Sequence, residues 1–192
     1  GKKIFYDFDK IVINAVILIN IFILTSIFNI NQKYILIAYT IIFLLSFKSK
    51  LFKKNLWNTF VNNSFVLCFL IIFLLSIDLA HELDLGWDAK GHYYFKTLIF
   101  FQNEKFENLT RFPVPDYPHL GSYIWSFFWK FPFGNYEYMG RISYIFIYVL
   151  SIFSIAQCLN LNKHLKNIFF ILIILCTYKY NLFSGLQDNL IF

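Results

Sequence analysis

The chain alternates between long apolar runs and short polar stretches. Membrane-spanning helices need roughly 20 predominantly apolar residues, and five runs reach or approach that length: 11–28, 34–47, 59–79, 140–159 and 168–183. Asn29–Lys33 lies between the first two runs and is predicted to form a turn. The pattern therefore predicts an all-α integral membrane protein, a multi-span helical bundle that occupies residues 1–192 as one domain.

A sixth apolar run, Leu120–Phe131, is too short to cross a bilayer. At 1.5 Å per residue it reaches less than about 20 Å as a helix, against a hydrocarbon core of about 30 Å. It has prolines on both sides, and it carries Tyr123, Trp125 and Trp129, residue types that are enriched at membrane interfaces. We predict an interfacial helix that lies along the membrane surface or re-enters it.

Composition supports a membrane protein and argues against a nucleic-acid partner. The 192 residues are 58% hydrophobic and 15% charged, whereas soluble domains are nearer half apolar and about a quarter charged. The net charge of +6 does not indicate a nucleic-acid partner, because the lysines lie in short loops beside apolar runs, as the positive-inside rule describes. Cys68, Cys158 and Cys176 lie within apolar runs without metal-ligand spacing, and we expect buried free thiols.

The two basic loops predict which side each segment faces. Lys48–Lys54 and Lys163–Lys166 are expected on the cytoplasmic side, so the chain must cross the membrane an even number of times between them. If Leu120–Phe131 does not cross, the polar stretch Ala80–Leu120 lies outside. The last run then travels outward, which places Asp188 on the same face as Asp88.

The outer loop, residues 80–120, carries six of the eleven acidic residues. Within it, Gly86-Trp87-Asp88 precedes a helix expected at Ala89–Phe101. Asp88 has two interpretations: an N-cap, because a carboxylate satisfies free N–H groups at a helix start, or a general base. His92, four residues later, is expected to pair with that carboxylate, although a metal-binding role is the alternative.

Other polar residues are further candidates for the site. Pro113–His119 is stiffened by three prolines, so Asp116 and His119 either mark a helix break or belong to the site. Arg141 begins a spanning run and is either an interface anchor or a phosphate ligand. Asp188 interrupts an apolar run, and ionisable residues in such places are often functional. The only expected cofactor is a divalent cation held by Asp84, Asp88 and Asp188, with solvated loop acids as the alternative.

The order of these motifs resembles the GT-C glycosyltransferases, which use polyprenyl-phosphate sugars, such as the protein mannosyltransferases and the lipid A aminoarabinose transferases. The resemblance rests on Trp87-Asp88 before a helix and on Asp116-Tyr117-Pro118 before an aromatic helix. Further matches are a Gly…Glu…Arg stretch (Gly134, Glu137, Arg141) and a small-residue-then-Asp element at 184–188. The chain departs from the family in having His119 after the proline and three runs before the loop.

The resemblance implies a membrane enzyme with Asp88 as the base and inversion at the sugar. The donor would be a polyprenyl-phosphate-linked sugar, and the acceptor a lipid, glycan or protein. Asp188 would orient the acceptor or a cation, with Asp116, His119 and His92 as further substrate contacts. The departing phosphate needs cationic stabilisation, for which Arg141, Lys90, Lys96 or a metal are the candidates.

The resemblance also suggests where the protein is found and how much of it this chain represents. The expected location is a bacterial inner membrane, in contact with membrane lipids and with the site on the periplasmic side. We expect the chain to be a piece from the N-terminal side of a longer protein. The alternative is a non-catalytic transporter or complex subunit, and a transporter is expected to hold ionisable residues near mid-bilayer.

The topology gives the first testable prediction. A cysteine introduced at Asn108 should react with a membrane-impermeant thiol reagent added from outside, whereas one at Lys53 should react only after permeabilisation. The reverse labelling pattern would place the outer loop in the cytoplasm and would refute the assigned orientation.

Overall fold

The computed structural model describes residues 2–47, 63–81, 83–102, 106–111, 119–130, 136–179 and 182–185. Within these residues every regular element is a helix, which confirms the all-α prediction for the described part of the chain. The α-helices are α1 (Lys2–Ile27), α2 (Gln32–Phe47), α4 (Asn63–His81), α5 (Tyr94–Phe101), α6 (Leu120–Lys130), α7 (Glu137–Cys158) and α8 (Lys163–Thr177). A π-helix, η1 (Ala89–Tyr93), precedes α5, and a 3-10 helix, η2 (Phe106–Arg111), follows it.

Two helices of the described residues are long and apolar enough to cross a membrane, namely α4 over Ser64–His81 and α7. An apolar stretch of α1, Val16–Ile27, is shorter, and α2 and α8 have 16 and 15 residues. These helices expose large aliphatic side chains, such as Leu74 at 54% and Leu175 at 70%. Apolar side chains that face outward suit a lipid environment, because lipid tails are as apolar as they are. The prediction of buried free thiols is confirmed for Cys68 and wrong for Cys158 and Cys176, whose side chains are exposed on the outer faces of their helices.

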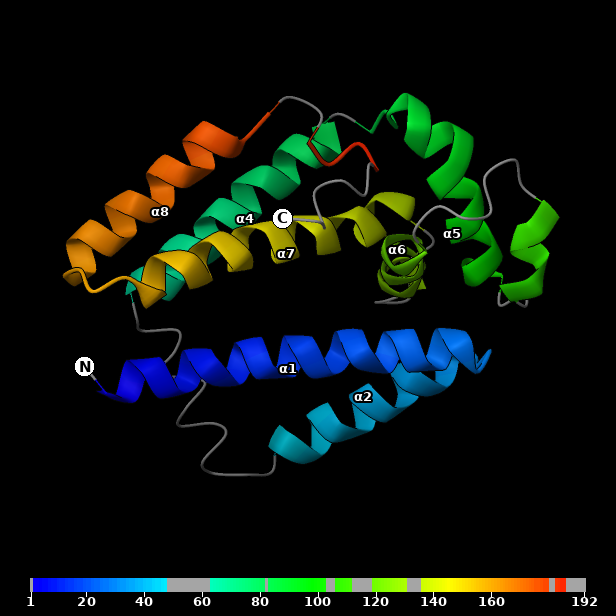
Figure 1. Cartoon of the computed structure of the whole chain (residues 1–192), viewed down its shortest axis with the longest axis horizontal. Coiled ribbons are helices and arrows are strands. Elements are labelled where there is room, and N and C mark those ends of the chain that lie inside the picture. Colours follow the sequence, from blue (N-terminus) through cyan, green and yellow to red (C-terminus); the bar gives the residue numbers. More distant parts are fainter. Residues whose placement is uncertain are drawn as a thin grey trace.

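One hydrophobic core lies between α4, α7 and α8, which run side by side (Figure 1). Phe153 of α7 packs between Phe65 of α4 and Phe170 of α8, with ring centroids 5.5 and 5.3 Å apart. All three rings are almost fully buried. These contacts fix the three helices against one another.

A second core joins α1 and α2 to α5 and α6. Phe22, Ile35, Phe100, Tyr123 and Phe127 are buried together there. The α1–α2 hairpin that supplies the first two ends α1 with a left-handed residue, Asn29 (φ 52°). The Ile30 N–H donates to Thr25 O (2.9 Å) and the Asn29 N–H to Ser26 O (3.2 Å), which is the Schellman pattern that satisfies the last carbonyls of a helix.

The short helix α6 lies between these two cores. Its eleven residues span about 16 Å, and its axis is seen end on in Figure 1 while α7 runs across the view. Eight of the eleven residues are buried, and Trp125 is 0% and Trp129 7% exposed. These rings pack between helices of the protein itself, and the location of α6 at a membrane interface stays a prediction.

A buried polar network ties α6 to the start of α2. The Gln32 amide donates to Tyr123 O (3.1 Å) and to Ser126 Oγ (2.7 Å). Lys130 Nζ donates to Gln32 Oε1 (3.0 Å) and to Phe100 O (2.8 Å). Burial, together with the neighbouring Lys33 charge, lowers the pKa of Lys130 to about 8.

The second basic segment is helical, which corrects the prediction of a loop at Lys163–Lys166. Asn162 caps α8, its Oδ1 accepting from the Leu165 N–H at 2.9 Å. The helix therefore begins at Lys163 and ends at Thr177, shifted toward the N-terminus of the predicted run, 168–183. The first basic loop, Lys48–Lys54, lies outside the described residues.

Lys130 generates a prediction about pH. Its folded-state pKa of about 8 lies below the ordinary value of 10.5, so between these values the unfolded chain binds more protons than the folded protein. Stability should consequently rise with pH across that window. The measurement is the thermal unfolding midpoint in detergent, compared with that of Lys130→Met at each pH. The wild-type midpoint should gain on the variant from pH 8 to 10.5, and parallel curves would contradict the shifted pKa.

Candidate functional site

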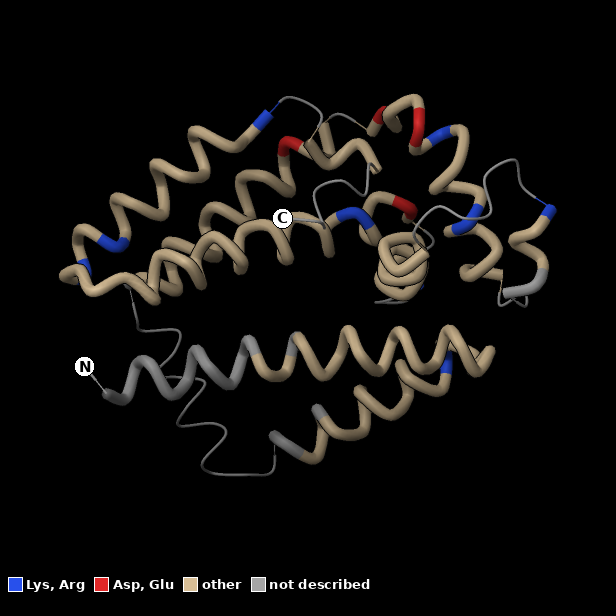
Figure 2. The backbone as a smooth tube through the Cα atoms, in the orientation of Figure 1, with Lys and Arg blue, Asp and Glu red and all other residues tan. Residues whose placement is uncertain are grey.

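Asp78, Asp84, Asp88 and Glu137 lie at one end of the bundle that α4, α7 and α8 form. Asp78 ends α4, Asp84 and Asp88 lie around the start of η1, and Glu137 begins α7 (Figure 2). The basic start of α8 lies at the opposite end. The polar end is therefore where the fold concentrates groups that could act on a substrate.

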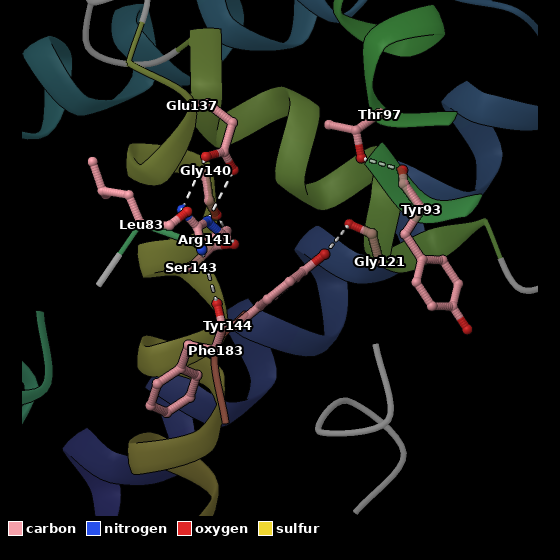
Figure 3. Close-up of polar contacts among 10 residues, drawn as sticks. All are labelled: Leu83, Tyr93, Thr97, Gly121, Glu137, Gly140, Arg141, Ser143, Tyr144 and Phe183. Atoms are coloured by element: carbon pink, nitrogen blue, oxygen red, sulfur yellow. Dashed lines mark hydrogen bonds and ion pairs between the residues drawn. The ribbon is translucent and has the colours of Figure 1, made fainter. Parts of the chain in front are cut away.

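A buried ion pair forms the centre of this end. The Arg141 side chain is 0% exposed and lies one helical turn after Glu137 on α7 (Figure 3). Arg141 Nε is 2.9 Å from Glu137 Oε1, and Arg141 Nη2 donates to Glu137 Oε2 at 3.0 Å. A guanidinium removed from water needs such a partner, since an isolated buried charge is very costly.

The same guanidinium holds two segments that are far apart in sequence. Arg141 Nη2 donates to Leu83 O (3.0 Å) and Nη1 to Phe183 O (3.5 Å). Beside these contacts the Gly86 N–H donates to Ser184 O at 2.8 Å. The link between α4 and η1 is thus joined directly to the segment 182–185.

Trp125 of α6 packs against two glycines of the site, Gly140 and Gly185. A Cβ added to Gly140 would lie 2.4 Å from Trp125 Cδ1, and one added to Gly185 would lie 2.7 Å from Trp125 Cη2. Gly185 also has φ +90°, and its added Cβ would lie 3.0 Å from Ala89 Cβ. Both positions require glycine because the indole occupies the space of a side chain. Four segments (η1, α6, α7 and 182–185) therefore meet around one ring.

Asp88 does not act as an N-cap here. The helix begins at Trp87, and the Lys90 N–H donates to Gly86 O at 2.9 Å. Asp88 has helical backbone angles (φ −65°, ψ −34°) and makes no side-chain capping hydrogen bond. The N-cap interpretation was therefore wrong, because the helix begins two residues earlier than that role requires and the Asp88 side chain makes no capping bond. Asp88 is exposed, and the adjacent Trp87 is 84% exposed.

The π-helix after Asp88 is fixed by α6. The Tyr94 N–H bonds to Ala89 O, five residues back. Tyr93 O accepts from Thr97 Oγ1 (2.8 Å) and from Ser122 Oγ of α6 (3.1 Å). Isolated π turns occur frequently at functional sites, and this one sets the orientation of the turn that carries Asp88.

The other predicted site residues are divided between surface and interior. His92 is half-buried on η1, and His119 is half-buried directly before α6. Lys96 is only 1% exposed, so neither it nor Arg141 presents its charge at the surface. Asp116 and Asp188 lie outside the described residues.

The described residues do not by themselves form a cation site. No group of three or more His, Cys, Asp or Glu side chains converges among them. Asp84 is exposed, and its carboxylate lies 3.8 Å from Lys90 Nζ. A divalent ion would therefore need ligands from beyond the described part of the chain.

Two features of this end were missed in the sequence. The Tyr178 hydroxyl donates to the Asp78 carboxylate, which ties the end of α8 to the end of α4. An acid within the third apolar run was the signal that could have indicated it. The Glu137–Arg141 pair was missed as a unit, although the i, i+4 spacing of opposite charges on a helix is a recognisable pattern.

In comparisons with known proteins, no protein-family model, no curated protein and no solved structure matches this chain.

The contacts of Trp125 give a prediction with a matched control. Gly140→Ala should lower the stability of the protein by about 1–3 kcal/mol or more, as overpacking a filled core does, because the new methyl meets both the indole and the Trp125 carbonyl at 2.4 Å. Gly91→Ala, on η1, meets nothing within 4 Å and should be neutral or mildly stabilising. Thermal unfolding of the two variants in detergent provides the measurement. Equal stability of both would show that Gly140 is not a packing requirement.

Proposed function

We propose that this chain forms the membrane part of a GT-C-type inverting glycosyltransferase with its site at the outer face. In this proposal α1, α2, α4, α7 and α8 cross the membrane and α6 lies along it. The observation that carries the proposal is the junction at Gly86 and Ser184. Because their backbones are hydrogen-bonded, Asp88 and the segment that leads to Asp188 start from one place.

The chemistry assigned to Asp88 is removal of a proton from the acceptor. The acceptor oxygen or nitrogen attacks the anomeric carbon of a polyprenyl-phosphate sugar from the face opposite the phosphate. The bond between that carbon and the phosphate oxygen breaks, and the lipid phosphate leaves with the electron pair. Asp88 takes the acceptor proton, and its exposure at the polar end leaves it accessible to a substrate.

The departing phosphate would be stabilised at the surface of the site. Arg141 is already paired with Glu137 and two carbonyls, and Lys96 is buried. Lys90 is the cation that fits this role best, because its side chain is 58% exposed and lies two residues after Asp88. The lipid tail of the donor would lie against the apolar faces of the helices, which suits a substrate divided between bilayer and water.

Asp88→Asn tests the assigned base. In the full-length protein it should reduce transfer from polyprenyl-phosphate mannose or aminoarabinose by roughly 10²–10⁴-fold, the usual contribution of general base catalysis. Because Asp88 makes no capping bond, the thermal unfolding midpoint should stay near that of the wild type. Glu107→Gln, the same carboxylate-to-amide change on η2 of the same loop, provides the control and should retain activity.

Transfer by Asp88→Asn at the wild-type rate would exclude Asp88 as the base, and Asp84 or Asp116 would become the candidates. A wild-type protein that transfers no sugar from any polyprenyl-phosphate donor would favour the non-catalytic alternative, a transporter or a complex subunit.

A further inference from the structure

We infer that Glu137 and Arg141 form a positioning clamp that holds the segment 83–88, which carries Asp88, against the segment 182–185, and that they do not bind the donor phosphate. This inference rests on the proposed function for the role of those segments. The contacts of the pair themselves are independent of it.

The first argument is that each nitrogen of the Arg141 guanidinium already faces a partner within the protein. Nε and Nη2 face the Glu137 carboxylate, while Nη1 and Nη2 also reach backbone carbonyls. The side chain is 0% exposed. To bind a phosphate, Arg141 would have to leave Glu137 unpaired in the interior, and breaking a buried pair in this way is strongly unfavourable.

The second argument is the position of the two carbonyls. Leu83 lies five residues before Asp88, and Phe183 lies five residues before Asp188. Five residues extend to at most about 18 Å, so holding the Leu83 carbonyl limits how far Asp88 can move from Arg141. Asp88 is restricted further, since it belongs to the helical turn that begins at Trp87.

The third argument is that the surroundings make the clamp rigid. Trp125 fills the space left by Gly140 and Gly185 on either side, and the hydroxyl of Tyr144, one turn below, donates to Gly121 O of α6 at 3.0 Å. Arg141, Trp125 and Tyr144 are all 0% exposed. With water excluded, hydrogen bonds to a charged group are stronger than at the surface.

The planar guanidinium is required for this geometry. Arginine presents five N–H donors in a fixed fork, whereas lysine presents a single point charge. Lysine at position 141 could keep the ion pair with Glu137 but could not reach both carbonyls at once. A small loss of register between catalytic groups can cost about 10²-fold in rate.

The test combines kinetics with a distance measurement that does not depend on activity. Cysteines replace Gly86 and Ser184 in a full-length protein whose native cysteines are changed to serine or alanine. The 2.8 Å hydrogen bond between these residues brings their Cα atoms within about 7 Å, the span of a disulfide. Oxidative cross-linking is then compared in the wild-type, Arg141→Lys and Arg111→Lys backgrounds. Arg111 is the other arginine of the chain, exposed on η2.

The clamp predicts that cross-linking is rapid in the wild-type and Arg111→Lys backgrounds and at least about tenfold slower with Arg141→Lys. In the enzyme without added cysteines, Arg141→Lys should lower kcat about 10²-fold and leave the donor KM within about threefold. A raised donor KM with unchanged kcat would identify Arg141 as a phosphate ligand and would overturn the inference. Unchanged cross-linking and unchanged kcat would overturn it as well.

A second variant separates the clamp from folding. Glu137→Met with Arg141→Met replaces the buried pair by apolar side chains, a change that proteins often tolerate in stability, while removing both bonds to the carbonyls. It should remain folded by size-exclusion chromatography yet cross-link slowly, and a folded double variant that cross-links at the wild-type rate would refute the clamp. If the wild type transfers no sugar, the proposed function fails, and the cross-linking comparison still decides whether the pair is a clamp.

Discussion

A buried guanidinium is the constraint on which the polar end of this protein depends. Arg141 lies on α7 with its charge fully removed from water, so its partners must be supplied by the protein. Glu137 supplies the opposite charge from one turn earlier on the same helix, and the chain supplies two carbonyls from segments a hundred residues apart. The requirement to satisfy one side chain thereby determines where the loop after α4 and the segment after α8 come together.

Helix α6 connects this end of the protein to the rest of the fold through its packing in both cores. On one side Tyr123 and Phe127 belong to the core with α1 and α2. On the other side Trp125 belongs to the core of α4, α7 and α8. The indole fits only because Gly140 and Gly185 have no side chain. A helix too short to cross a membrane therefore acts as the joint between two helical layers, and its packing is coupled to the site through Trp125 and Ser122.

The site that emerges differs in character from the one expected from sequence. Two of the expected cations, Lys96 and Arg141, are interior groups, whereas Asp88 and Lys90 are at the surface. Function under the proposal is thus divided between exposed groups that could meet a substrate and buried groups that place them. The π turn at Ala89–Tyr93 connects the two sets, because the Tyr93 carbonyl accepts a hydrogen bond from Ser122 Oγ of α6.

The sequence by itself determined the helical class, the long apolar helices α4 and α7, and the shortness of α6. Those features follow from the length of apolar runs and from the rise of a helix, which are local properties. It also predicted Asp88 and the segment 184–188 as parts of a site, and the fold joins Gly86 to Ser184 by a backbone hydrogen bond. The start of α8 at Lys163 was not recognised, although the Asn162 cap is itself a local signal.

Only the tertiary structure decided the burial of the aromatic rings of α6, the contacts of Arg141 with the Leu83 and Phe183 carbonyls, and the contact between Gly86 and Ser184. A tryptophan beside a membrane helix has the same sequence signature whether it faces lipid headgroups or another helix. An arginine at a helix start likewise suits a phosphate, an interface or an internal carboxylate. Which partner it takes depends on the segments that the fold brings within about 3 Å of it, and those segments lie too far away in sequence for any local pattern to specify them.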